Sequence, residues 1–226
     1  MASLARVART VASTSPSRLT ALNTARAFST SPTVQEDVEN VTVFGAGLMG
    51  AGIAQVLAHK GGYNVTLSDV TDKALANGQN IISKSLTRIA KKSMADASAD
   101  EQSKFVKGVV DSIKYSTDAK GSVKDTDLVI EAIVENIDIK RQLFELLDKE
   151  APQEALFASN TSSLAIKDIA AATKRLDRFG GFHAFNPVPQ MKLVEIIRTN
   201  ETSQDTFDSL MSVAKKMGKV PVACVD

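Results

Sequence analysis

The sequence predicts an α/β fold, in which a doubly wound, largely parallel sheet carries helices on both faces. Short apolar or β-branched runs alternate with longer segments of helical periodicity along most of the chain. Such alternation is typical of βαβ units, whose strands are parallel. A glycine-rich segment at residues 45–50 joins the first expected strand to the first expected helix, which also favours this fold class.

The individual elements follow from local composition. The expected strands are β-rich or apolar runs at residues 41–44, 63–69, 112–116, 127–133, 155–159, 179–185, 193–198 and 220–225. The expected helices are the periodic segments at residues 48–59, 71–92, 102–110, 138–150, 166–172 and 204–217. The glycines at 61–62 and 218 are expected to end helices. The second and third helices form a helical insertion after the second strand.

Composition excludes several classes of protein. The chain has 226 residues, of which 43% are hydrophobic, and this composition is sufficient for one globular core. A formal charge of +1 and the absence of tryptophan argue against a nucleic-acid partner. No apolar run approaches the roughly 18 residues of a membrane span, and no metal site is expected. The single cysteine, Cys224, allows no internal disulfide.

The first 33 residues differ in composition from the rest of the chain. They contain four arginines and many serines, whereas the first acidic residue is Glu36. This composition is typical of a mitochondrial transit peptide, and residues 26–29 resemble a processing site. The alternative is a disordered tail without a targeting role. The sequence therefore predicts a targeting segment at residues 1–33, a folded domain at 38–226 and location in the mitochondrial matrix.

A dinucleotide site is predicted at the glycine-rich segment, Gly45-Ala46-Gly47-Leu48-Met49-Gly50. In a strand–turn–helix context, the first glycine permits the tight turn, the second lets a pyrophosphate approach and the third allows close packing. Asp69 ends the second expected strand, about 20 residues further on, where a carboxylate binds the adenosine ribose. No arginine follows Asp69 to hold a 2′-phosphate, so the pattern indicates NAD rather than NADP. The alternative is a structural turn beside a surface aspartate.

A chemical site is predicted at His183. It lies in an apolar strand, whereas the other histidine, His59, falls at an expected helix end and is interpreted as a surface residue or C-cap. If the two strands around residues 186–192 pair antiparallel, His183 and Glu195 face each other, because each is equally distant from Pro189. A carboxylate beside an imidazole suits a general base, although a structural ion pair has the same spacing.

Short polar side chains at residues 160–163 follow another expected strand. They could bind a substrate at the carboxyl edge of the sheet, or cap the following helix.

Four ordered motifs give a resemblance to a known family. Residues 45–55 (GAGLMGAGIAQ), 131–136 (EAIVEN), 158–164 (ASNTSSL) and 183–195 (HAFNPVPQMKLVE) resemble the N-terminal, Rossmann-type NAD-binding domain of the 3-hydroxyacyl-CoA dehydrogenases of fatty-acid β-oxidation, in particular the short-chain mitochondrial type. The resemblance extends from about residue 38 to 226. It implies an oxidoreductase that converts L-3-hydroxyacyl-CoA and NAD⁺ to 3-ketoacyl-CoA and NADH.

The resemblance also implies roles for individual residues. His183 would be the general base, oriented by Glu195, and Ser162 and Asn186 would bind substrate oxygens beside the nicotinamide. The remaining implied contacts are Glu135 and Lys140 to the nicotinamide half of the cofactor, and Ser85 and Lys92 to coenzyme A. A solvated helix end is the alternative interpretation of Lys92.

In this family a helical C-terminal domain completes the cleft and forms a homodimer, and the sequence resembles only the N-terminal domain. The expectation from sequence is therefore a 3-hydroxyacyl-CoA dehydrogenase whose C-terminal domain and dimer interface are absent. Two alternatives stay open, namely an inert NAD-binding fragment and a different hydroxyacid dehydrogenase. The latter would be expected to use a catalytic lysine instead of His183 and Glu195.

Overall fold

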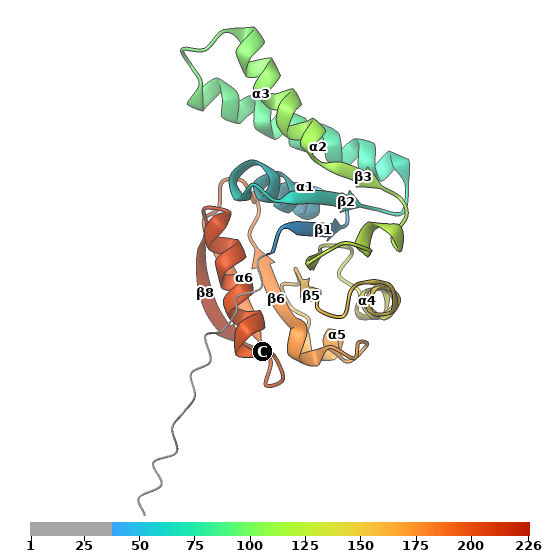
Figure 1. The fold of residues 1–226 in the computed structure, drawn as a ribbon. Helices are drawn as coiled ribbons and strands as arrows, with labels where there is room; N and C mark the ends of the chain where they lie inside the picture. Colours follow the sequence, from blue (N-terminus) through green and yellow to red (C-terminus); the bar gives the residue numbers. More distant parts are fainter. Residues whose placement is uncertain (1–37) are drawn as a thin grey trace, which may run out of the picture. The chain divides into compact units, whose positions relative to one another are not determined.

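The computed structural model describes residues 38–226, so the predicted targeting segment lies outside the described residues. They form one eight-stranded sheet with the strand order β3-β2-β1-β4-β5-β6-β7-β8 (Figure 1). Strands β1 to β6 are parallel, β7 is antiparallel to β6, and β8 is parallel to β7. The doubly wound, largely parallel sheet expected from the sequence is therefore confirmed.

The elements lie close to their predicted positions. The strands are Asn40–Phe44 (β1), Asn64–Ser68 (β2), Lys114–Ser116 (β3), Leu128–Glu131 (β4), Leu156–Ser159 (β5), Phe179–Ala184 (β6), Leu193–Arg198 (β7) and Val220–Val225 (β8). The helices are Leu48–Val56 (α1), Asp72–Ser93 (α2), Ala99–Ser112 (α3), Ile137–Glu150 (α4), Ile166–Ala170 (α5) and Gln204–Lys216 (α6). Shorter turns are Leu57–Gly61 (η1), Gly121–Val123 (η2) and Leu176–Arg178 (η3).

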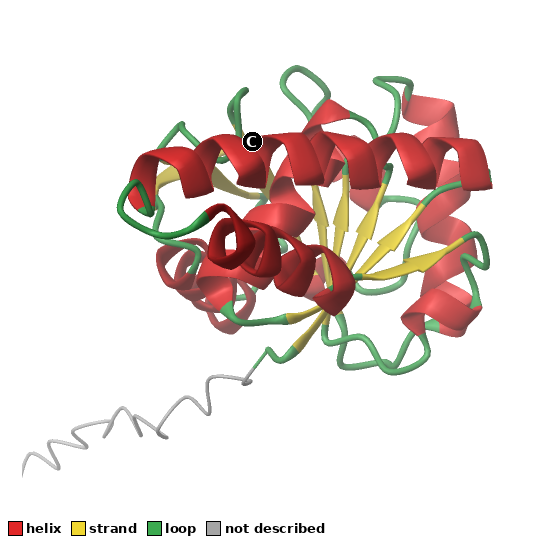
Figure 2. Cartoon of the chain, turned by 90° about the horizontal axis from the view of Figure 1, so that it is seen from above, coloured by secondary structure: helices red, strands yellow, loops and turns green. Residues whose placement is uncertain are grey.

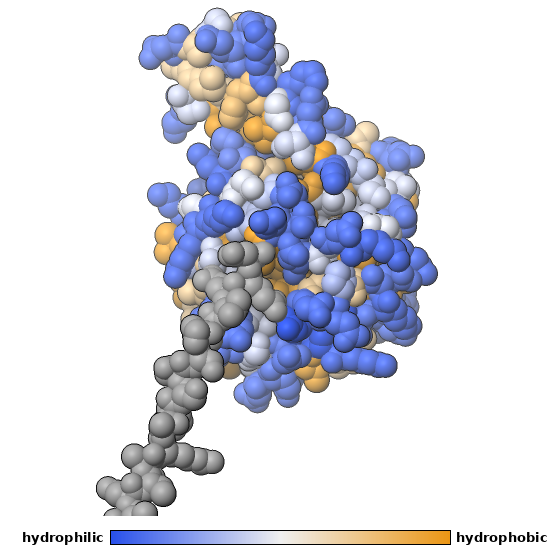
Figure 3. Space-filling view, viewed as in Figure 1, coloured by the Kyte–Doolittle hydropathy of each residue, from blue (hydrophilic) through white to orange (hydrophobic). Residues whose placement is uncertain are grey.

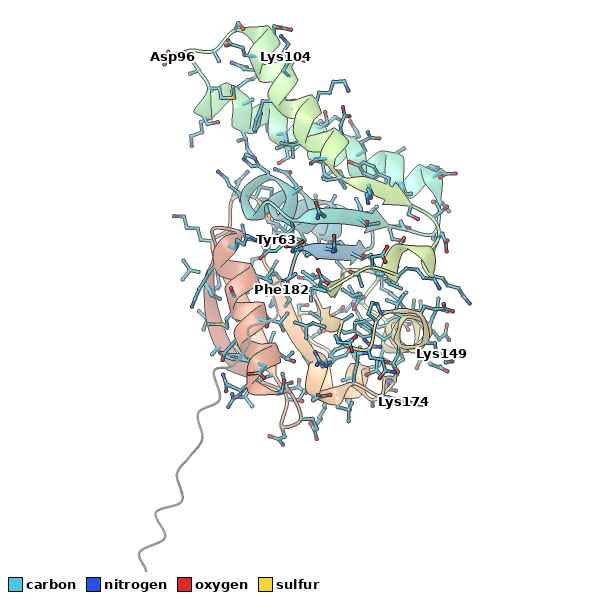
Figure 4. The ribbon with its side chains drawn as sticks, viewed as in Figure 1. Tyr63, Asp96, Lys104, Lys149, Lys174 and Phe182 are labelled. Atoms are coloured by element: carbon cyan, nitrogen blue, oxygen red, sulfur yellow. The ribbon has the colours of Figure 1, made fainter. Side chains whose placement is uncertain are left out.

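Helices cover both faces of the sheet, as Figure 2 shows from above. Successive strand residues point to opposite faces, so Val43 joins a core with α1, α2 and α6, whereas Phe44 joins a core with α4 and α5. Phe182, fully buried, lies in the first of these cores beneath α6 (Figure 4). Its neighbour His183 therefore points to the opposite face, where it is only partly buried.

The predicted helical insertion is the pair α2 and α3, which pack against each other. Helix α3 begins earlier than the periodicity predicts because Ser98 and Glu101 form a capping box at its start. Figure 3 shows hydrophobic residues at the surface over this pair, while hydrophilic residues cover most of the same view. Within the described residues, no helix is both long and apolar enough to cross a membrane.

Several predicted elements end at other residues than expected, and two of these differences have a clear local cause. The helix expected at 48–59 is α-helical only to Val56 and continues as the π-helical turn η1, where the ring of His59 packs edge-on against Phe105 at 5.1 Å. The interpretation of His59 as a surface residue is thus only partly right. Strand β4 ends at Glu131 and not at residue 133, because the Glu131 carboxylate accepts the backbone N–H of Ile133 (2.8 Å) and turns the chain out of the sheet.

Candidate functional site

The loop between β1 and α1 is shaped by three glycines with different constraints. Gly45 has a φ of +99°, and a Cβ there would lie 2.5 Å from the carbonyl oxygen of Ala132. A Cβ on Gly50 would lie 1.8 Å from the carbonyl oxygen of Gly45. Gly47, in contrast, has no atom within 4 Å of the corresponding position, so its surroundings are open. The fold itself requires Gly45 and Gly50, whereas Gly47 leaves room for a ligand.

The same loop offers a binding site for a phosphate group. Helix α1 follows Gly47 without a side-chain cap, so its first N–H groups are free to bind an anion. The Asp69 carboxylate, at the end of β2, accepts the N–H of Ala46 and that of Val70, both at 2.7 Å. These two bonds fix Asp69 beside the loop and leave acceptor capacity on both oxygens. The arrangement fits the pyrophosphate and ribose of a dinucleotide, as predicted.

His183 and Glu195 form the predicted pair at the carboxyl edge of the sheet. They are direct partners in the antiparallel register of β6 and β7, and His183 Nδ1 lies 2.8 Å from Glu195 Oε2. The side chains are 17% and 35% exposed, so both reach the surface of the site. An ionised carboxylate only accepts, so Nδ1–H donates to Glu195 and Nε2 carries the lone pair. Paired in this way, His183 can accept a proton from a bound ligand.

A buried charge network lies beside this edge. Lys140 and Glu131 have no exposed side-chain surface and form an ion pair at 2.6 Å. Glu131 also accepts the hydroxyl of Ser159 at 2.6 Å, and Lys140 lies 3.2 Å from Glu135. Burial acts to raise the pKa of Glu135, but the hydrogen bond from Thr161 and the charge of Lys140 outweigh it and hold the pKa below its usual value. Because Lys140 is enclosed, a direct contact between it and a ligand is excluded in this structure, and its exposed partner is Glu135.

Glu135 in turn holds the polar segment at residues 160–163. Its carboxylate accepts the hydroxyl of Thr161 (2.5 Å) and the backbone N–H of Ser162 (3.2 Å). Ser162 is exposed, and its hydroxyl has no partner among the described residues. The helix-capping alternative for this segment is wrong, since the Asp226 carboxylate accepts the first N–H groups of α5. Ser162 is therefore free to bind a ligand.

Lys219 anchors the connection between β6 and β7 through hydrogen bonds to its backbone. This buried ammonium donates to the carbonyl oxygens of Val188 and of Met191, the latter at 2.7 Å, and burial lowers its pKa. Asn186, at the start of the connection, is exposed and lines a cavity of about 380 Å³ together with Ser85 of α2. Lys92, predicted with Ser85 as a coenzyme A contact, is exposed at the end of α2 and does not line this cavity.

Two residues of this region, Glu131 and Lys219, are missing from the sequence prediction. Glu131 ends an otherwise apolar strand, and a lone carboxylate in that position is a signal for a buried partner. Asn160, the first residue of the predicted polar segment, accepts the Ala184 N–H at 2.9 Å and so connects the end of β5 to the end of β6 beside His183. Lys219 carried no sequence signal, because its partners are backbone carbonyls 28 and 31 residues away. Among the described residues, no cluster of side chains fits a metal ion.

The strand order, the open glycine loop, the uncapped helix and the carboxylate of Asp69 together define a Rossmann-type dinucleotide-binding domain. A family profile described as "3-hydroxyacyl-CoA dehydrogenase, NAD binding domain" matches residues 40–226. The chain belongs to the 3-hydroxyacyl-CoA dehydrogenase family, and the matched domain binds NAD.

Individual relatives agree with this family. The mitochondrial hydroxyacyl-coenzyme A dehydrogenases of Rattus norvegicus and Homo sapiens are each 53% identical over 191 residues, which cover 84% of this chain and 60% of those proteins. The crystal structure of (S)-3-hydroxybutyryl-CoA dehydrogenase from Ralstonia eutropha superposes with a TM-score of 0.76 at 39% identity, over 84% of this chain and 64% of that one. The chain thus spans about 60% of the length of the curated relatives it matches.

Proposed function

We propose that this protein oxidises L-3-hydroxyacyl-CoA to 3-ketoacyl-CoA with NAD⁺, in fatty-acid β-oxidation in the mitochondrial matrix. The observation that carries the proposal is the His183–Glu195 pair at the sheet edge that also bears the glycine loop. The relatives from rat and human are named mitochondrial dehydrogenases, which supports the substrate class and the location. The arginine-rich composition of residues 1–33 supports a transit peptide.

The proposed chemistry assigns one proton transfer to His183. Its Nε2 accepts the proton of the substrate's 3-hydroxyl, because Nδ1–H is engaged by Glu195. Glu195 fixes the orientation of the ring and stabilises the imidazolium that forms. Bound NAD⁺ supplies the acceptor for the hydride that leaves C3 of the substrate.

Neighbouring residues hold the reactants in this proposal. Ser162 and Asn186, both exposed at this edge, bind the substrate oxygens, and Gly45–Gly50 with Asp69 binds the adenosine diphosphate half of the cofactor. Glu135, held by Lys140, positions the Ser162 loop. Ser85 and Lys92 on α2 contact the coenzyme A moiety.

The test is oxidation of NADH by the purified chain with acetoacetyl-CoA, compared with the variant His183→Ala. We expect turnover with NADH and little with NADPH, since Asp69 repels a 2′-phosphate. Loss of the base should lower kcat by a factor of about 10² to 10⁴ while the Kd for NADH stays unchanged. Equal kcat in the two proteins would contradict the role of His183. Tight NADH binding without any turnover would favour the inert NAD-binding domain.

A further inference from the structure

Gln55, in helix α1, is a buried amide without a partner. Gln55 is only 1% exposed. Neither its Nε2 nor its Oε1 has a hydrogen-bond partner among the residues that the structure describes. Buried polar groups in folded proteins are almost always hydrogen-bonded, because an unpaired one loses its bonds to water without compensation. This amide offers both a donor and an acceptor, so a bound molecule with both kinds of group would satisfy it.

The amide lies at the cavity of about 380 Å³ that also contains Asn186 and Ser85. Leu48, Gly52 and Gln55, spaced by four and three residues, present one face of α1 to it. The wall opposite is formed by the β6–β7 connection, and a Cβ on Gly52 would lie 2.9 Å from Cβ of Val188. Leu48, Ile81 and Val188 thus give this cavity apolar walls, and Gln55 adds a single buried amide to them.

The polar residues that line this cavity come from two elements and differ in chemistry. Asn186 follows the strand that bears His183, where the proposed reaction takes place. Lys84 and Arg88, one helical turn apart on α2, are exposed and have no ion-pair partner within the described part of the chain. Such cations suit a phosphate group. A ligand in this cavity can therefore meet both a residue next to the reacting site and two cations.

We propose that Gln55 binds the amide groups of the pantetheine arm of the acyl-CoA substrate and so selects coenzyme A thioesters over free 3-hydroxy acids. The inference rests on the proposed function and adds a specificity residue to it. The arm is a linear chain in which amides alternate with apolar segments, which matches one amide among apolar walls. Its phosphate end would meet Lys84 and Arg88, and its thioester end would meet Asn186.

The inference is tested by calorimetric titration of the full chain with coenzyme A and with pantetheine, in which the variant Gln55→Met is compared with the wild type. This variant keeps the length of the side chain and removes its donor and acceptor. We expect the Kd for both ligands to rise about tenfold, as for the loss of one or two hydrogen bonds, and the Kd for NADH to stay unchanged. The control is Gln79→Met on the exposed part of α2, which should bind all three ligands like the wild type.

Unchanged affinity of Gln55→Met for coenzyme A and pantetheine overturns the inference, and the amide then holds a water molecule. If this variant also loses NADH binding, the inference is tested by NMR on the wild-type chain instead. Its Gln55 side-chain N–H resonances shift on addition of pantetheine if the inference holds, and unshifted resonances overturn it. Absence of acetoacetyl-CoA turnover in the wild type is the separate failure of the proposed function. If the wild type turns over acetoacetyl-CoA and Gln55→Met binds coenzyme A and pantetheine like the wild type, only this inference fails.

Discussion

At the scale of single residues, the site depends on side chains that never reach a ligand. Glu131 and Lys140 are fully buried, and the carboxylate of Glu131 is bonded to Lys140, to Ser159 and to the N–H of Ile133. A buried charge is costly unless each of its bonds is satisfied, and here the bonds converge on the loop that carries Ser162. The pair therefore acts as a rigid support for the proposed substrate site.

Removal of one member of this pair should be strongly destabilising. In Lys140→Met the Glu131 carboxylate stays buried without its counter-charge, and we expect a loss of about 3–5 kcal/mol in the free energy of unfolding. Urea denaturation followed by circular dichroism measures the loss. Lys149→Met is the matched control on the same helix, since Lys149 pairs with Glu145 on the exposed side (Figure 4). It should change stability by about 0.5 kcal/mol or less. Similar losses in the two variants would show that the buried pair has no special role.

Sequence patterns identified the reacting residues better than their supports. His183 and Glu195 could be predicted because their equal spacing from Pro189 fixes the register of a hairpin. Gln55 ends the motif at residues 45–55, yet the sequence alone interprets it as one more helical residue. Its burial without a partner depends on where α2 and the β6–β7 connection pack, and helical periodicity does not specify those positions.

At the scale of elements, different glycines of the β1–loop–α1 unit serve folding and ligand binding. Gly45 and Gly50 are in contact with backbone atoms, whereas Gly47 faces open space at the uncapped start of α1. The glycine pattern in the sequence predicts the unit, but the different constraint on each glycine becomes clear only when the surrounding backbone is known.

This separation gives a prediction for Gly47→Ala. The new methyl group meets no protein atom within 4 Å, so we expect the melting temperature to change by only a few degrees. The same methyl group occupies the space for a pyrophosphate, and the Kd for NADH should rise at least about tenfold. Fluorescence titration with NADH and a thermal melt measure the two effects.

Gly108→Ala in α3 is the control. A Cβ on Gly108 also has no atom within 4 Å, and Gly108 is distant in sequence from the loop between β1 and α1. It should stabilise the helix by about 0.5–1 kcal/mol and leave NADH binding unchanged. Equal NADH affinity in Gly47→Ala and the wild type would argue that the pyrophosphate binds elsewhere.

At the scale of the whole molecule, the alternation of strands and helices predicts a parallel sheet, and the structure confirms it over β1 to β6. What the alternation does not predict is the reversed pair β7 and β8 at one edge. Glu195 lies on β7 and Lys219 immediately precedes β8, so this edge of the sheet supplies the partner of His183 and anchors the connection that lines the cavity. The short connection at residues 185–192 makes β7 antiparallel to β6, and the crossover through α6 makes β8 parallel to β7.

The most direct measurement is a single turnover of L-3-hydroxybutyryl-CoA with excess chain and NAD⁺, followed by NADH absorbance. The His183–Glu195 pair predicts rapid NADH formation in the wild type. It predicts a rate lower by a factor of about 10² or more in His183→Gln, with unchanged NAD⁺ binding. Equal rates in the two proteins, or NAD⁺ binding without any NADH formation in the wild type, would contradict the assignment of the chemistry to this pair.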